Sequence, residues 1–156
     1  MLTVTEDQWS PLFADLQERL SAENRRIMLS KLIGSILDVT QRNIGYSGID
    51  RPFEWAALST EYALEMHDGD TTPTLFLPEE KHQQIHPGEP HMIDNFRVDL
   101  GTAAATLTNL SEYASEHQEG KGAMYRPFFP VNTDGSLTPN MVIRLQGVFV
   151  SHFTPA

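Results

Sequence analysis

The sequence predicts an α+β domain with two N-terminal helices, a small antiparallel β-sheet and a C-terminal helix. Apolar residues recur every three or four positions before residue 45 and again after residue 138, which is typical of amphipathic helices. From residue 92 the period changes to two, which indicates paired strands. The 156 residues contain no internal repeat and no linker, so we expect one domain spanning 1–156.

The first helix is expected near the N-terminus, because Thr5 to Gln8 has the form of a capping box. Apolar residues follow it at helical spacing, namely Trp9, Leu12, Phe13, Leu16 and Leu20. The second helix is predicted from Ala22 to Ile44, with Gly45 as its stop signal. At 1.5 Å per residue it would be about 33 Å long. We therefore expect it to pack across a sheet or along a neighbouring subunit.

The region from Gly45 to Pro90 is expected to be irregular, because glycine and proline recur through it. A short helix is predicted around Ser59 to Met66, and Thr74 to Leu77 suits either a short buried strand or a docked loop. Two interpretations remain open for the region from Gly45 to Pro90. It is either a functional loop ordered by a partner or a surface connection.

A β-hairpin is predicted next, because Phe96, Val98 and Leu100 alternate with polar residues before a turn at Gly101. Residues 103–110 would form the returning strand, although their alanines also suit a helix.

Three further elements complete the prediction. A short helix capped by Ser111 is expected to end at His117, and a short strand is expected from Arg126 to Val131. The final helix would begin with Thr138 as N-cap and Pro139 at its first position. A strand at residues 141–150 is the alternative, because that stretch is rich in β-branched residues.

The charge and the composition exclude several classes of function. The formal net charge is −10, and the 11 Lys and Arg residues are scattered, whereas phosphate contacts need clustered cations. No apolar run approaches the roughly 20 residues of a membrane span. The absence of cysteine excludes disulfides, thiolate metal sites and cysteine catalysis. We therefore expect a soluble protein with no membrane partner and no sequence-specific nucleic-acid partner.

The strongest candidates for chemistry are His82, His86 and His91, which lie within ten residues of one another. A helical His82–His86 pair could chelate zinc, which makes a small metal-dependent hydrolase one alternative function. Such an enzyme needs a glutamate directly after the first histidine, and Gln83 stands there instead. We predict no metal site, no cofactor and no catalytic residue, so the chain is not expected to be an enzyme.

Aromatic residues are the candidates for an assembly interface. On the predicted strand, the adjacent Phe128 and Phe129 would point to opposite faces, so one of them would need cover from a neighbouring subunit. Tyr125 and Phe76 are the other two candidates, the latter within the loop from Thr71 to Pro90.

Three segments occur in an order that resembles a known family. They are Trp55-Ala56-Ala57-Leu58-Ser59 followed by Tyr62-Ala63, then Tyr113-Ala114 with His117-Gln118 and Gly120, and finally Arg126-Pro127-Phe128. In this order the chain resembles the bacteriophage virion-morphogenesis family, the tail-completion and neck proteins of Mu-like phages. Within these segments, seven residues are expected to shape the fold: Trp55, Tyr113, His117, Gln118, Gly120, Arg126 and Pro127.

The resemblance implies a structural protein of phage or prophage assembly. It would act at the head–tail junction, or terminate and complete the tail. Its partners would be tail-tube or head–tail connector proteins and further copies of itself in a ring. It would be found in the cytoplasm of the bacterial host during assembly and later in the virion. A monomeric protein-binding module is the remaining alternative.

Overall fold

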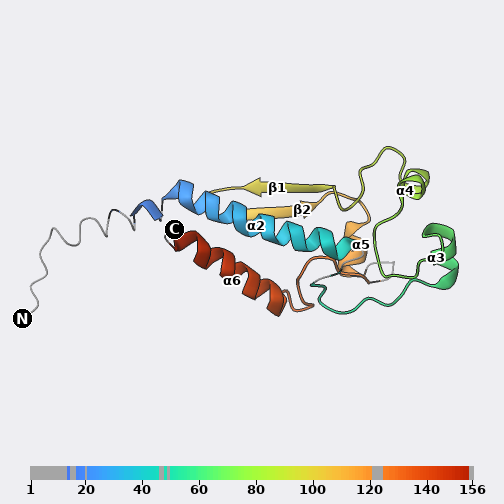
Figure 1. The fold of residues 1–156 in the computed structure, drawn as a ribbon. Helices are drawn as coiled ribbons and strands as arrows, with labels where there is room; N and C mark the ends of the chain where they lie inside the picture. Colours follow the sequence, from blue (N-terminus) through green and yellow to red (C-terminus); the bar gives the residue numbers. More distant parts are fainter. Residues whose placement is uncertain are drawn as a thin grey trace, which may run out of the picture.

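The fold is α+β, as the sequence predicts, with one helix near each end of the chain and a two-stranded antiparallel sheet between them (Figure 1). The computed structural model describes residues 14, 17–19, 21–45, 48, 50–120 and 125–154. The elements in order are α2 (Ala22–Ile44), α3 (Thr60–Met66), α4 (Glu79–Ile85), β1 (Phe96–Leu100), β2 (Ala105–Asn109), α5 (Ala114–Glu119) and α6 (Pro139–Phe153).

The first predicted helix lies largely outside the described residues. Residues 14 and 17–19 are described, and their backbone is helical.

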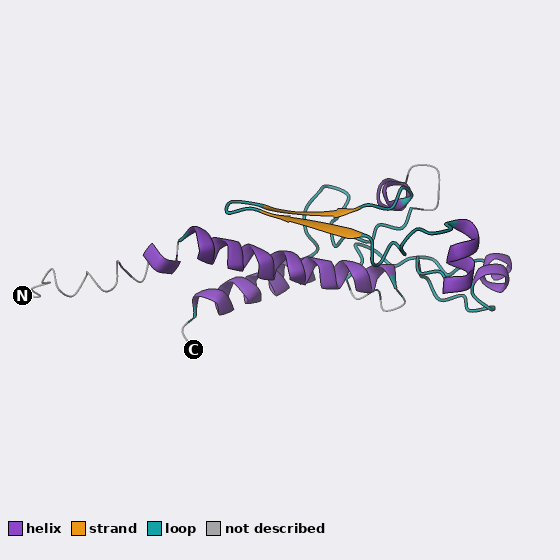
Figure 2. Cartoon of the chain, turned by 90° about the horizontal axis from the view of Figure 1, so that it is seen from above, coloured by secondary structure: helices purple, strands orange, loops and turns teal. Residues whose placement is uncertain are grey.

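Helix α2 has the predicted bounds and is the central element of the fold. The hydroxyl of Ser21 accepts a hydrogen bond from the backbone N–H of Asn24 at 3.2 Å, which caps the helix N-terminus. The helix contacts α6 and both strands, and the hairpin runs along it in both views (Figures 1 and 2). Its buried residues all lie in its last six positions, at Val39, Thr40, Asn43 and Ile44.

The hairpin forms where it is predicted, although its second strand is shorter. Phe96 pairs with Asn109, and Leu100 pairs with Ala105. Two of the alanines that also suited a helix lie in the turn, where Gly101 N–H donates to Ala104 O at 2.9 Å. Two strands alone are marginally stable in water, so the hairpin depends on its packing against α2.

The region from residue 45 to residue 90 contains more helix than predicted. Helix α3 forms where a short helix is predicted, and the structure adds that Ser59 is its N-cap. Helix α4 was not predicted, because prolines stand on both sides of it. Glu79 and Glu80 occupy its first turn, where carboxylates interact favourably with the helix dipole. Thr74 to Leu77 is a docked loop, tied to the end of α2 by the hydrogen bond from Leu75 N–H to Ile44 O at 2.8 Å.

Two predictions in the last third of the chain are corrected. Helix α5 begins three residues after Ser111, which instead accepts a turn hydrogen bond from Ala114 N–H. The predicted strand from Arg126 to Val131 does not form, and only Val131 pairs, through a single bridge to Leu137. Prolines at 127 and 130 remove two backbone donors from this segment, so it cannot pair continuously with another strand.

Helix α6 forms instead of the alternative strand, with Thr138 as N-cap and Pro139 at its start. Met141 is its only buried residue. In the described part of the chain, every helix is too short or too polar to cross a membrane.

The core lies at one end of the molecule, where the C-terminus of α2 meets the segments that carry α3, α4 and α5 (Figure 1). Its buried members are Ile44, Trp55, Met92, Ala114 and Phe128.

Candidate functional site

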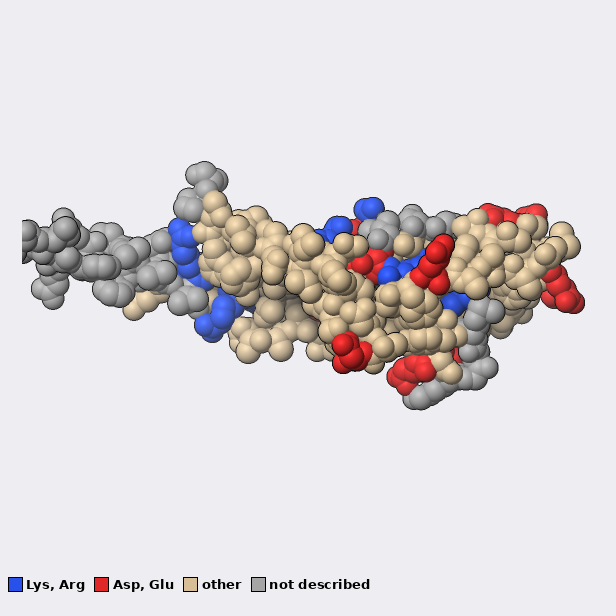
Figure 3. All heavy atoms as spheres, turned by 90° about the horizontal axis from the view of Figure 1, so that it is seen from below, with Lys and Arg blue, Asp and Glu red and all other residues tan. Residues whose placement is uncertain are grey.

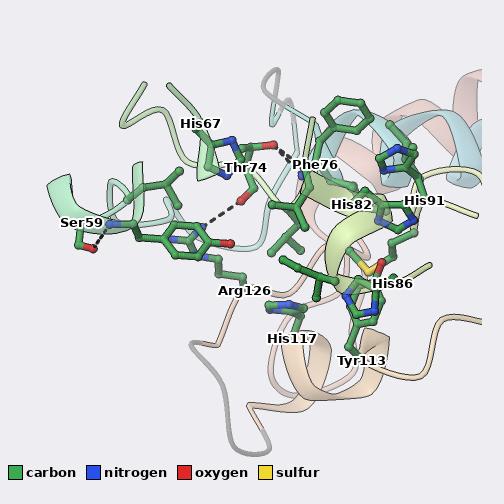
Figure 4. Close-up of a pocket in the computed structure, with 18 residues that line it drawn as sticks. Ser59, His67, Thr74, Phe76, His82, His86, His91, Tyr113, His117 and Arg126 are labelled. Atoms are coloured by element: carbon green, nitrogen blue, oxygen red, sulfur yellow. Dashed lines mark hydrogen bonds between the residues drawn. The ribbon is translucent and has the colours of Figure 1, made fainter. Parts of the chain in front are cut away.

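The main cavity has a volume of about 450 Å³ and lies beside the core, between α3, α4, α5 and the loop around Thr74 (Figure 4). Apolar side chains form much of its wall, among them Leu58, Leu75, Ile85 and Met92. Five of the six histidines of the chain also line it, together with one arginine: His67, His82, His86, His91, His117 and Arg126. No aspartate or glutamate of the described residues does so.

A column of neighbouring rings, most of them stacked in pairs, forms one wall of this cavity. The ring centroid of His91 lies 4.9 Å from that of Phe76 and 3.9 Å from that of His82. His82 in turn lies 5.5 Å from His86, whose ring stacks on Tyr113 at 4.6 Å. A helix as short as α4 is not stable alone, so these contacts hold it against α5 and the loop around Phe76.

Two of the three clustered histidines, His82 and His91, form hydrogen bonds through a ring nitrogen within the protein. Nε2 of His82 lies 2.9 Å from the carbonyl oxygen of Glu89, and Nε2 of His91 lies 2.7 Å from a carboxylate oxygen of Glu79. The hydrogen bond to His91, followed by that from Gln83, lowers the pKa of the Glu79 carboxyl. Across the described ranges, no group of three or more His, Cys, Asp or Glu side chains could hold a metal ion. The metal-hydrolase alternative therefore has no ligand set there.

The guanidinium group of Arg126 lies in the cavity wall opposite the ring column, and that of Arg51 lies near it but outside the wall. Arg126 is 4% exposed and donates to Thr74 O at 3.1 Å and to Ala56 O at 3.2 Å. Arg51 lies 3.7 Å above the ring of Trp55, and the Arg126 guanidinium lies 5.8 Å from the same ring. Burial, followed by repulsion from Arg126, lowers the pKa of Arg51 to about 10. This side of the cavity is therefore positively charged.

His67 lines the same side and is 6% exposed. Its Nδ1 atom is buried and has no hydrogen-bond partner among the described residues. Burial is the main cause that lowers the pKa of His67, and the nearby charge of Asp70 partly opposes this decrease. His67 is therefore a neutral imidazole near pH 7, and one of its ring nitrogens has no hydrogen-bond partner among the described residues.

The residues expected to shape the fold lie together around α5. The side-chain oxygen of Gln118 accepts hydrogen bonds from the backbone N–H groups of Phe128 and Phe129, at 3.0 and 3.1 Å. Arg126 N–H donates to His117 O at 3.0 Å. Gly120 ends α5 with φ of 71°, a left-handed conformation that favours glycine. These contacts attach the extended segment that contains Pro127 to α5, while Trp55 lies in the core.

The structure separates the four candidate interface residues. Phe128 is 0% exposed and belongs to the core, so it is removed from the candidate interface. Phe129 also packs against the core instead of facing away from it, because the segment is not a strand and its side chains do not alternate. Phe76 is half-buried and stacks on His91. Tyr125 is 37% exposed and lies beside Phe53, with ring centroids 5.3 Å apart.

Sequence reasoning did not identify an apolar groove between α2 and α6. The groove has a volume of about 340 Å³, and its lining includes Leu32, Leu137, Val142, Leu145, Phe149 and Val150. One signal in the sequence could have indicated this groove: α6 has more apolar residues than a single buried helix face needs.

No protein-family model, curated protein sequence or solved structure matches the chain significantly.

Proposed function

We propose that this chain is a structural, self-associating protein of phage or prophage assembly, which acts at the head–tail junction or completes the tail. The observation that carries self-association is the exposed apolar surface of α6. Ile143 is 66% exposed, Val150 61% and Phe149 49%, while Val142 is 38% exposed. Contiguous apolar surface of this kind marks a site of protein contact. The phage assignment is supported by the three segments that begin at Trp55, Tyr113 and Arg126, because they occur along the chain in the order seen in the family that the chain resembles.

A second copy of the chain is the occupant that we assign to the groove between α2 and α6, because the charge of the molecule is divided between its parts. Helices α2 and α6 together carry five basic and two acidic residues. Residues 50–120 and 125–138 carry fifteen acidic and four basic residues. On the face drawn in Figure 3, carboxylates gather over the end with α3 and α4 and basic residues lie at the opposite end, while residues of both signs lie along the middle.

Opposite charges on different parts of one molecule favour head-to-tail contacts, in which different surfaces of two copies meet. Such contacts give a ring when the rotation between copies closes. In this proposal, a ring made in the host cytoplasm would meet tail-tube or connector proteins and remain in the virion.

The test is the solution mass by light scattering over a range of protein concentrations. We expect the mass to rise to several copies. We expect the Ile143→Glu variant to remain monomeric, because it places a charge on the exposed apolar surface of α6 next to the groove residue Val142. The matched control is Leu64→Glu on α3, since Leu64 is also 66% exposed. A wild-type protein that is monomeric at every concentration would contradict self-association. Equal effects of the two substitutions would contradict the role of α6.

A further inference from the structure

We propose that the main cavity beside the core is a binding site for a small organic anion with a flat, apolar body and one carboxylate. The inference does not rest on the proposed assembly function, because the cavity and the α6 surface share no lining residue.

The size and the wall of the cavity indicate the body of the ligand. A volume of about 450 Å³ lies within the range of small-molecule sites, which are mostly apolar with a few convergent polar groups. The rings of His82, His86 and Tyr113 lie on this wall together with Ile85 and Met92, and those of His86 and Tyr113 are stacked. A planar aromatic ligand can lie against these rings, because aromatic pairs favour offset-stacked or edge-to-face contacts.

The charge of the lining indicates the head group. The chain has a formal net charge of −10, yet its described carboxylates are all absent from the cavity wall. The guanidinium of Arg126 lies in that wall, and the charge of Arg51 is close enough to affect it. A negative charge is therefore favoured in the cavity and a positive charge is disfavoured.

His67 supplies the independent observation that a polar ligand atom belongs here. A buried nitrogen without a hydrogen bond is energetically unfavourable, so such groups normally have a partner. Nδ1 of His67 is buried and has no partner in the described part of the protein. When that nitrogen carries the proton, it can donate to a carboxylate oxygen.

The two kinds of lining lie on different sides, which gives the ligand a direction. His67, Thr74 and Arg126 lie on one side of the cavity, and the rings of His86 and Tyr113 lie on the other (Figure 4). The carboxylate would meet His67 and Arg126, while the flat body would lie along the ring column.

The probes are 2-naphthoate and its neutral isostere 2-naphthamide, titrated into the full chain at neutral pH by isothermal calorimetry. We expect 2-naphthoate to bind at least about tenfold more tightly than the amide, because only the acid carries the negative charge. In the His67→Phe variant, which keeps a ring but removes the donor, we expect about tenfold weaker binding of 2-naphthoate. We expect a smaller loss for the amide, because its neutral oxygen accepts a weaker hydrogen bond than a carboxylate does.

Two further variants locate the binding. Ile85→Trp places a larger side chain at a cavity-lining position that is 46% exposed, and we expect it to prevent binding of both probes. The matched control is Val150→Trp in the α6 groove, which we expect to leave binding unchanged.

Failure of both probes to bind, or equal affinity for acid and amide, would overturn the proposal. Loss of binding in Val150→Trp would place the probe in the groove. Ile143→Glu distinguishes the two proposals, since it should abolish association and retain binding.

Discussion

At the scale of single residues, Asn43 holds three parts of the chain together. Its side-chain nitrogen donates to Asp50 O and to Phe128 O, both at 3.0 Å, and its side-chain oxygen accepts from Asp50 N–H at 3.0 Å. The Asp50 carboxylate accepts a hydrogen bond from the hydroxyl of Thr138, the N-cap of α6, at 2.7 Å. One buried amide thus helps to connect α2 with the segment before α6.

We predict that Asn43→Leu lowers the free energy of unfolding by about 3 kcal/mol, because it leaves two carbonyls and one N–H buried without these partners. The measurement is urea unfolding, with a lower midpoint and an unchanged slope. Asn140→Leu on the surface of α6 is the matched control, and it should change stability by less than about 0.5 kcal/mol. Equal midpoints for the two variants would contradict the role of Asn43.

His67 gives a pH dependence with a defined sign. Burial lowers its pKa in the folded protein below the ordinary value of 6.5, so the unfolded chain binds a proton more readily. Its contribution to stability is complete above pH 6.5 and is lost as the pH falls toward the folded-state pKa. We predict that His67→Phe loses less stability than the wild type between pH 7 and pH 5.5, measured by urea unfolding. Parallel losses in both proteins would contradict this assignment.

At the scale of elements, α4 depends on ring contacts made by side chains outside it. His86, which follows the helix directly, stacks on Tyr113 next to α5, and His82 stacks on His91. Helix α4 has only seven residues, and no side chain forms a hydrogen bond at its N-cap, so it relies on these ring contacts. We therefore expect α4 to open locally more easily than α2.

We predict that His86→Ala increases the hydrogen-exchange rate of the α4 amides about fivefold, since an aromatic pair contributes about 1 kcal/mol. His86→Phe keeps a ring in the same place and should restore the slow exchange. Mass-spectrometric exchange of peptides covering Glu79–Ile85 provides the measurement. The stacking account would be wrong if the two variants exchanged at the same rate.

At the scale of the whole molecule, the core and the apolar surface lie in different places. The buried cluster around Trp55 and Phe128 stabilises the end where α3, α4 and α5 gather, while α6 has only Met141 buried. Together with the division of charge described above, this arrangement favours association through α2 and α6.

We predict that raising the salt from about 50 mM to about 500 mM reduces association, because the Debye length falls and charges on neighbouring copies are screened. The same light-scattering experiment at several salt concentrations measures this change. Association that strengthens with sodium chloride would show that the apolar contact dominates and that opposite charges do not bring the copies together.

The local signals of the sequence were sufficient for the main elements. Helix α2 was predicted to its end residues, and the hairpin and α6 were predicted because periodicity and capping residues such as Thr138 act within a few positions. Contacts between distant segments governed the rest. Helix α4 forms between prolines because rings from residues 91 and 113 stack near it, and Phe128 is buried because Gln118 holds its backbone. The cavity follows from the same cause, since His67, His82 and Arg126 meet only when the chain has folded.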